Sequence, residues 1–187
     1  MIPGNSFTVT PIVGTFLYLQ ELPYTPLHQQ VLGGVALGDG SMGRLVKPWE
    51  VTYASGNITV NPVGGAVELT LAEPDVSSVS LAFDANMSPV IAWQGSVGTT
   101  IYFFNGLTST YVTQTFSGTT SCRVCVDDPR EFYSAQSDVM LGYTLNGNLC
   151  YRQQRDRYSI EYIASSTTKQ LIKFGPSSVN RLQFGLI

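Results

Sequence analysis

The sequence predicts an all-β protein built from antiparallel sheets. Short segments rich in Val, Ile, Thr, Tyr, Phe and Trp recur along the chain, and pairs such as Ser-Gly, Gly-Gly and Asn-Gly separate many of them. Ten tyrosines, nine phenylalanines and 18 glycines fit a chain of many strands joined by tight turns. At 187 residues, the chain is long enough to bury a substantial core.

The spacing of the expected strands predicts repeated four-stranded units. Residues 79–116 contain four expected strands, and residues 122–163 contain about four more with an inserted loop. Residues 49–71 give three strands of a similar, incomplete unit, and residues 169–187 supply one or two more. Repeats of roughly 40–45 residues with four antiparallel strands are typical of propeller blades, but a propeller normally needs at least about four blades. The sequence therefore predicts an incomplete propeller or, alternatively, a β-sandwich.

The clearest hairpin signal is centred on Asn146-Gly147, because both residues tolerate the positive φ of a tight turn. A three-residue loop would place Tyr143 opposite Tyr151 and keep one face apolar. A two-residue turn would pair Tyr143 with Cys150, which is a poorer match. We therefore expect a longer or bulged turn here.

The N-terminal region differs from the rest, because it is rich in proline and has a glycine-rich run at 32–43. We expect residues 1–45 to form an arm or docking segment and residues 46–187 to form a β-rich body. Within the arm, 12–22 is an expected strand and 28–32 at most a helical turn. Such an arm either lies along a neighbouring subunit, adding a strand to it, or folds back as a cap on its own chain.

Charge excludes several classes of function. The net charge of −3 argues against nucleic-acid binding and against an anionic membrane surface. No window of about 18 apolar residues is present, so we expect no membrane-spanning helix. Charged residues make up only 12% of the chain, against roughly 25% in typical soluble domains. This low charge favours a subunit of a permanent assembly over a monomer with a Ser/Thr-rich surface.

The cysteines predict neither a disulfide framework nor a metal site. Cys122 and Cys125 have the spacing of a zinc or redox half-site, but residues three apart on a strand point to opposite faces. The third cysteine is Cys150, and the only histidine, His28, is far away in sequence. We expect buried thiols, and no metal or other cofactor.

Four segments carry a family resemblance: KPWEVTYASGNITV, VSLAFDANMSPVIAW, SDVMLGYTLNGNLCYRQQRDRYSIEY and VNRLQFGLI. They resemble a family of tailed-bacteriophage virion structural proteins, in which a Trp-containing strand, an LAFD-x-N-M-x-P-V-x-A-W unit and a DV-x-L-x-Y-x-x-x-G-x-L-x-Y-R-x-Q-R-D-R unit recur in this order. The resemblance covers about residues 46–187. It implies a component of the tail or of the head-to-tail region, and its motifs are structural signatures without a chemical site.

The charged run at residues 152–157, in the third of these segments, is the clearest candidate site. On a strand, Arg155 and Arg157 would share one face, and Arg152 and Asp156 the other. Such groups pair with carboxylates of their own fold or of a neighbouring subunit, which is the interpretation we favour. The alternative is an anion site for sialic acid or sulfate.

The LAFD unit predicts a turn and a core tryptophan. Asp84 and Asn86 have side chains suited to closing a turn, Pro89 opens the next strand, and Trp93 fills the core. Together with Trp49 of the first unit, Trp93 is a structural candidate.

We therefore expect a non-enzymatic virion protein of a tailed phage that forms homo-oligomers and docks other tail proteins. An alternative is a module that binds a host receptor or glycan at the particle surface, using aromatics at 102–111 or at Phe132-Tyr133 to stack on sugars.

A glycosidase or depolymerase is the third, less favoured function. It would need a carboxylate pair such as Asp127 with Glu131, or Asp84 with Asp138. Neither pair lies in a recognisable catalytic signature.

Overall fold

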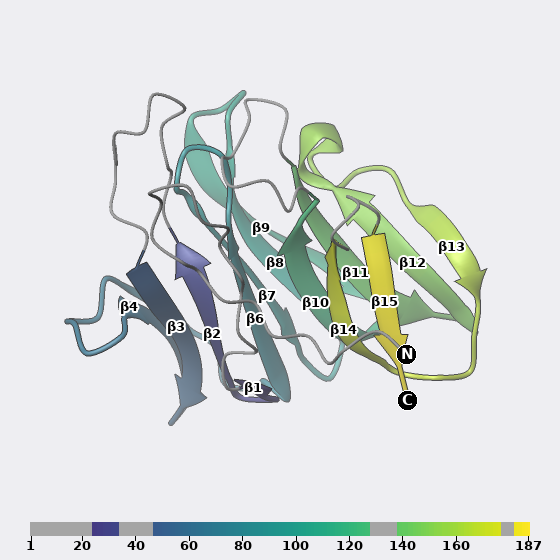
Figure 1. Ribbon diagram of the computed structural model, residues 1–187, viewed down its shortest axis with the longest axis horizontal. Helices are drawn as coiled ribbons and strands as arrows, with labels where there is room; N and C mark the ends of the chain where they lie inside the picture. Colours follow the sequence, from purple (N-terminus) through teal and green to yellow (C-terminus); the bar gives the residue numbers. More distant parts are fainter. Residues whose placement is uncertain (1–23, 34–46, 128–137, 177–181) are drawn as a thin grey trace, which may run out of the picture.

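The computed structural model describes residues 24–33, 47–127, 138–176 and 182–187 (Figure 1). These residues form 15 β-strands, grouped into four antiparallel sheets, and one short 3₁₀ turn. The prediction of an all-β fold is confirmed.

Each sheet is a meander in which strands that follow one another in sequence are hydrogen-bonded neighbours. The first sheet contains β1 (Tyr24–Thr25), β2 (His28–Gly33), β3 (Lys47–Ala54), β4 (Asn57–Pro62) and β5 (Leu69–Ala72). The second contains β6 (Ser78–Phe83), β7 (Pro89–Gln94), β8 (Gly98–Asn105) and β9 (Thr110–Ser117). The third contains β10 (Thr120–Val126), β11 (Val139–Leu145), β12 (Asn148–Gln153) and β13 (Tyr162–Ser166), and the 3₁₀ turn η1 (Gln154–Asp156) follows β12. The fourth contains β14 (Leu171–Pro176) and β15 (Leu182–Leu186).

Three apolar cores join the sheets in chain order. The core between the first and second sheets includes Val51, Ile58, Leu81 and Trp93. The core between the second and third includes Ile101, Phe103, Leu141 and Tyr143, and that between the third and fourth includes Met140, Leu149, Leu171 and Phe174. The second and third sheets are therefore covered on both faces. This explains why the four central residues of β7 are buried and its two end residues are half-buried.

One strand of each sheet lies beside one strand of the next: β2 beside β6, β6 beside β10, and β10 beside β14. The Val79 amide donates to the Pro26 carbonyl across 2.7 Å, and the Val124 amide donates to Ser80 Oγ across 3.0 Å. This is the arrangement of neighbouring propeller blades, and it matches the predicted units at 79–116 and 122–163. Among the described residues, no core joins the first sheet to the fourth, so the blades form an open series in this part of the chain.

The outer face of the first sheet is polar. Glu50 accepts hydrogen bonds from Asn61 at 2.8 Å and contacts His28 at 3.3 Å, and the hydroxyl groups of Thr52 and Thr59 lie 2.7 Å apart. The bond from Asn61 lowers the pKa of Glu50. In the described part of the chain, this face therefore carries polar groups that bond to one another.

The hairpin at Asn146-Gly147 has a two-residue turn, so the predicted longer or bulged turn is wrong. Asn146 and Gly147 have φ of 49° and 75°, and Tyr143 faces Cys150. The first six residues of β11 are buried, because the second and fourth sheets cover its two faces. Because both faces of β11 are buried, the register between β11 and β12 does not depend on keeping one face apolar. The hairpin therefore forms the two-residue turn, whose twist matches that of the strands.

Part of the predicted arm belongs to the first sheet. β2 pairs along its whole length with β3, and the Gln29 side chain accepts a hydrogen bond from the Leu81 amide at 2.8 Å. The prediction of a helical turn at 28–32 is wrong, because pairing with β3 overrides the weak local signal. The strand expected at 12–22 lies outside the described residues.

Candidate functional site

The run 152–157 forms a turn, not a continuing strand. β12 ends within it, η1 follows, and Arg157 and Tyr158 then adopt left-handed backbone angles with φ of 51° and 56°. The predicted strand alternation, with Arg155 and Arg157 on one face, is therefore wrong. The next strand, β13, begins only at Tyr162. We call residues 152–158 the arginine turn.

Tyr158 holds the arginine turn in place. It is fully buried between the second and third sheets, where its ring meets Phe103 edge-on at a centroid distance of 4.8 Å. Its hydroxyl donates to the Val139 carbonyl across 3.2 Å, and burial raises its pKa. A left-handed conformation costs a non-glycine residue about 1–2 kcal/mol, and burial of a large aromatic side chain offsets that cost.

Arg152 is bonded on all sides within its own chain. Its Nε donates to the Tyr143 hydroxyl at 2.6 Å, its Nη1 to the Tyr158 carbonyl at 2.8 Å and its Nη2 to Glu161 at 3.1 Å. The guanidinium also lies 4.3 Å from the centre of the Phe116 ring, at cation–π distance. Because Phe116 belongs to β9, this one side chain joins the second sheet to the third.

The Tyr143 hydroxyl completes this cluster by donating to Glu161. Burial, followed by the bond to Glu161, raises the pKa of Tyr143, so the phenol stays protonated at neutral pH. Tyr143 is fully buried and its hydroxyl bonds to both Arg152 and Glu161, so this cluster stabilises the contact between the second and third sheets.

Arg155 binds the two aspartates that flank the segment 128–137 in sequence. Its Nε donates to Asp138 Oδ2 at 2.7 Å and its Nη2 to Asp127 Oδ2 at 3.3 Å, and its backbone amide donates to Asp138 Oδ1 at 3.0 Å. Asp127 and Asp138 stand at the two ends of that segment. Burial raises the pKa of Asp138, and the bonds from Arg155 counter only part of this effect.

Two further contacts tie the turn to its surroundings. Gln154 Nε2 donates to Asp84 Oδ2 at 3.2 Å, and the Tyr162 hydroxyl donates to Asp156 at 3.0 Å. Asp84 Oδ1 in turn accepts the backbone amides of Asn86 and Ser88, which closes the β6–β7 turn as the sequence predicted.

Arg157 differs from its neighbours. Its backbone amide donates to the Gln154 carbonyl, while its side chain is exposed and makes no ion pair among the described residues. Of the three arginines, Arg152 and Arg155 thus have internal partners, and Arg157 points its charge to the surface.

The two tryptophans lie at the interface of the first and second sheets. Trp93 is buried there, as expected, and Trp49 packs on the same core with its ring 5.2 Å from that of Phe83. Pro89 opens β7, where the sequence placed it.

The cysteines are buried free thiols. Cys122 faces the second sheet and Cys125 the fourth, which confirms that the pair points to opposite faces. Burial raises the pKa of Cys122 to about 11 and raises that of Cys125, so both stay protonated at neutral pH. In the ranges that the structure describes, no three His, Cys, Asp or Glu side chains are placed to hold a metal ion.

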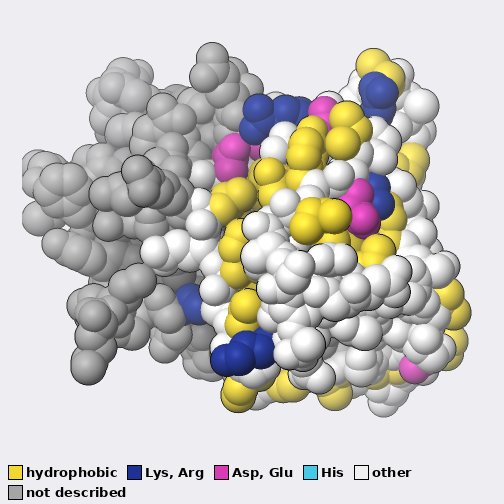
Figure 2. Space-filling model, turned by 90° about the vertical axis from the view of Figure 1, so that its right-hand side faces the viewer, with side chains coloured by type: hydrophobic (Ala, Val, Ile, Leu, Met, Phe, Trp, Pro, Cys, Tyr) yellow, Lys and Arg dark blue, Asp and Glu magenta, His cyan; other side chains and the backbone are white. Residues whose placement is uncertain are grey.

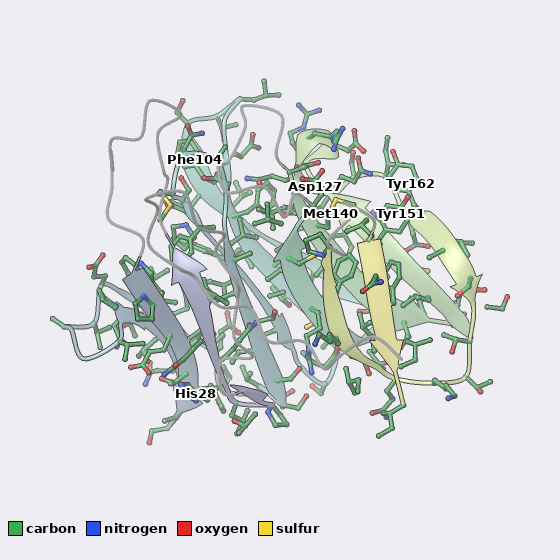
Figure 3. The ribbon with its side chains drawn as sticks, viewed as in Figure 1. His28, Phe104, Asp127, Met140, Tyr151 and Tyr162 are labelled. Carbon is green, nitrogen blue, oxygen red and sulfur yellow. The ribbon has the colours of Figure 1, made fainter. Side chains whose placement is uncertain are left out.

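The carboxylate pairs proposed for glycoside hydrolysis are occupied where they are described. Asp84 and Asp138 are both buried, and each accepts at least one hydrogen bond from a backbone amide. Asp84 also accepts one from the Gln154 side chain, and Asp138 one from the Arg155 side chain. Asp127 binds Arg155, and Glu131 lies outside the described residues. His28 lies in the first sheet, well apart from Asp127 (Figure 3).

The aromatic residues considered for sugar binding form a cluster on β8 and β9. The rings of Tyr102 and Tyr111 stack at 4.8 Å with 3° between their planes, and Phe104 meets Tyr111 edge-on at 5.3 Å. Tyr111 is 41% exposed. Phe132 and Tyr133 lie outside the described residues.

Comparison of the chain with known protein families, curated proteins and solved structures found no match. Within the described ranges, no helix has the length and apolar character needed to cross a membrane.

Proposed function

We propose that this chain is a non-enzymatic structural protein of a tailed-bacteriophage particle, located in or next to the tail, where it forms homo-oligomers and docks other tail proteins. The observation that carries the proposal is the set of contacts made by the YRQQRDR string, which belongs to one of the four segments of the resemblance. Its Arg152 and Arg155 bind Tyr143, Glu161 and Asp138 of the same chain. A motif whose arginines bind side chains of the same chain stabilises that chain's own fold, as a rigid structural subunit requires.

The composition of the surface also supports an assembly subunit. The face in Figure 2 carries few charged side chains, and hydrophobic groups lie among neutral polar ones. Ile160 and Ile163 are among the large apolar side chains left exposed. Exposed apolar groups on a surface with little charge are expected where a partner covers them.

The proposal is tested on particles of the phage that encodes the chain. Quantitative mass spectrometry of gradient-purified particles should find the protein in a fixed ratio to the other tail proteins, and labelled antibody should bind at the tail. Abundance in the lysate together with absence from purified particles would refute the proposal.

The exposed aromatic cluster supports a second candidate function, glycan binding at the particle surface. A sugar ring would stack on Tyr111, because aromatic faces attract the apolar faces of sugars. Tyr102 already stacks on one face of that ring and Phe104 meets the ring edge-on, which leaves at most one face for a ligand. A glycan array with wild-type protein and with Tyr111→Ala separates the candidates: signal lost in the variant supports binding, and no wild-type signal removes it.

A further inference from the structure

Within the described residues, β9 is an open sheet edge, and its own sequence has no feature that blocks pairing. Among the described residues it pairs only with β8, through all eight of its residues and without a register shift. Five of the eight are exposed, and its sequence TYVTQTFS contains no charge, proline or glycine. Natural sheet edges are normally short, charged, bulged or interrupted by proline, because an open row of backbone amides and carbonyls binds further strands.

The last strands of the other three sheets carry such protection. β5 has four residues and is flanked by Glu68 and Glu73. β13 has five residues and an irregular register against β12 next to Leu149. β15 has five residues, includes Gly185 and is also irregular in register. β9 is thus the longest and most regular of the four.

We propose that β9 pairs antiparallel with β9 of a second copy of this chain, which joins two four-stranded sheets into one of eight strands. A second copy fits this edge because the strand is neutral throughout, so identical strands meet without like-charge repulsion. Two-fold symmetry requires the axis to pass through a single residue, and we place it at Thr113. Thr113 then faces itself and Tyr111 faces Thr115, which are favourable Thr–Thr and aromatic–β-branched pairs.

This inference rests on the proposed assembly function for its biological setting, but it is tested separately. Dimers in solution with no protein in particles would refute the function alone, and protein in particles with no solution dimer would refute the pairing alone.

The test uses the self-facing position. Wild-type protein should dimerise in sedimentation equilibrium, and Thr113→Lys should weaken dimerisation roughly tenfold or more, because two like charges meet at the axis. Thr113→Glu should do the same, and an equimolar mixture of the two variants should dimerise again. Thr70→Lys, an exposed threonine on the outer strand β5, is the matched control and should leave dimerisation unchanged.

Rescue by the mixture establishes that the position faces itself, and it cannot arise from misfolding of either variant. A wild-type monomer at the highest soluble concentration overturns the proposal. So does a dimer that resists both Thr113 variants, since its interface would then lie elsewhere.

Discussion

Arg155 donates two hydrogen bonds to the Asp138 carboxylate. Its backbone amide donates to Oδ1 at 3.0 Å, and its guanidinium Nε donates to Oδ2 at 2.7 Å. The Asp138 side chain is only 6% exposed, while that of Arg155 is 57% exposed. The contact therefore matters more for the carboxylate than for the guanidinium, since only the carboxylate has lost most of its water.

Arg155→Gln should lower the free energy of unfolding by about 1–3 kcal/mol, because it leaves a buried carboxylate without its charged partner. The backbone bond remains, and solvent screening at the exposed guanidinium limits the loss. Urea denaturation measures the change. Arg157→Gln removes the same charge from the same turn, where no internal ion pair is lost, and should stay within about 0.5 kcal/mol of wild type. Equal losses in the two variants would show that net charge, not the contact, sets stability.

Asp138 should make a pH-dependent contribution of definite sign. Its pKa is raised in the folded state, so the folded protein holds a proton there at pH values where the unfolded chain has released it. Its contribution to the free energy of unfolding therefore falls as pH rises from about 4 through the folded pKa. The difference in unfolding free energy between wild type and Asp138→Asn, measured across this range, should decline with rising pH. A difference that grows with pH would contradict the direction of the shift.

Gly98→Ala should be strongly destabilising. The residue has φ of 153°, and a Cβ there would lie 2.1 Å from the Phe116 carbonyl oxygen, so the backbone of β8 or β9 must move. A loss of about 3 kcal/mol is expected in thermal or urea denaturation. Gly106→Ala, in the loop between the same two strands, meets no atom within 4 Å and should change stability by less than about 0.5 kcal/mol.

Tyr158 should prove to be the anchor of the arginine turn. Tyr158→Ala removes a fully buried aromatic side chain and should cost about 3–5 kcal/mol. Tyr158→Phe keeps the ring and loses the hydroxyl bond to the Val139 carbonyl, for about 1 kcal/mol. Both values come from urea denaturation. A Phe variant as unstable as the Ala variant would mean that the hydroxyl, not the packing, holds the turn.

Alternation and turn residues alone determined most of the strands. The four strands expected within residues 79–116 are β6 to β9, and Pro89 opens β7 as expected. The opposite faces of Cys122 and Cys125 follow from the two-residue period of a strand. These features depend on neighbours in sequence, so they are visible without the fold. The grouping into four-stranded units followed from the same local signals.

Tertiary structure alone decided the register of the hairpin and the course of the arginine turn. Tyr143 faces Cys150 because sheets on both sides bury β11, a condition that no local pattern reveals. The run after β12 leaves the strand because Tyr158 packs against Phe103 in the core, and burial of that ring outweighs the left-handed backbone. Arg155 meets Asp138 only across that turn. Contacts between distant segments supply these energies, and they exist only once the sheets have packed.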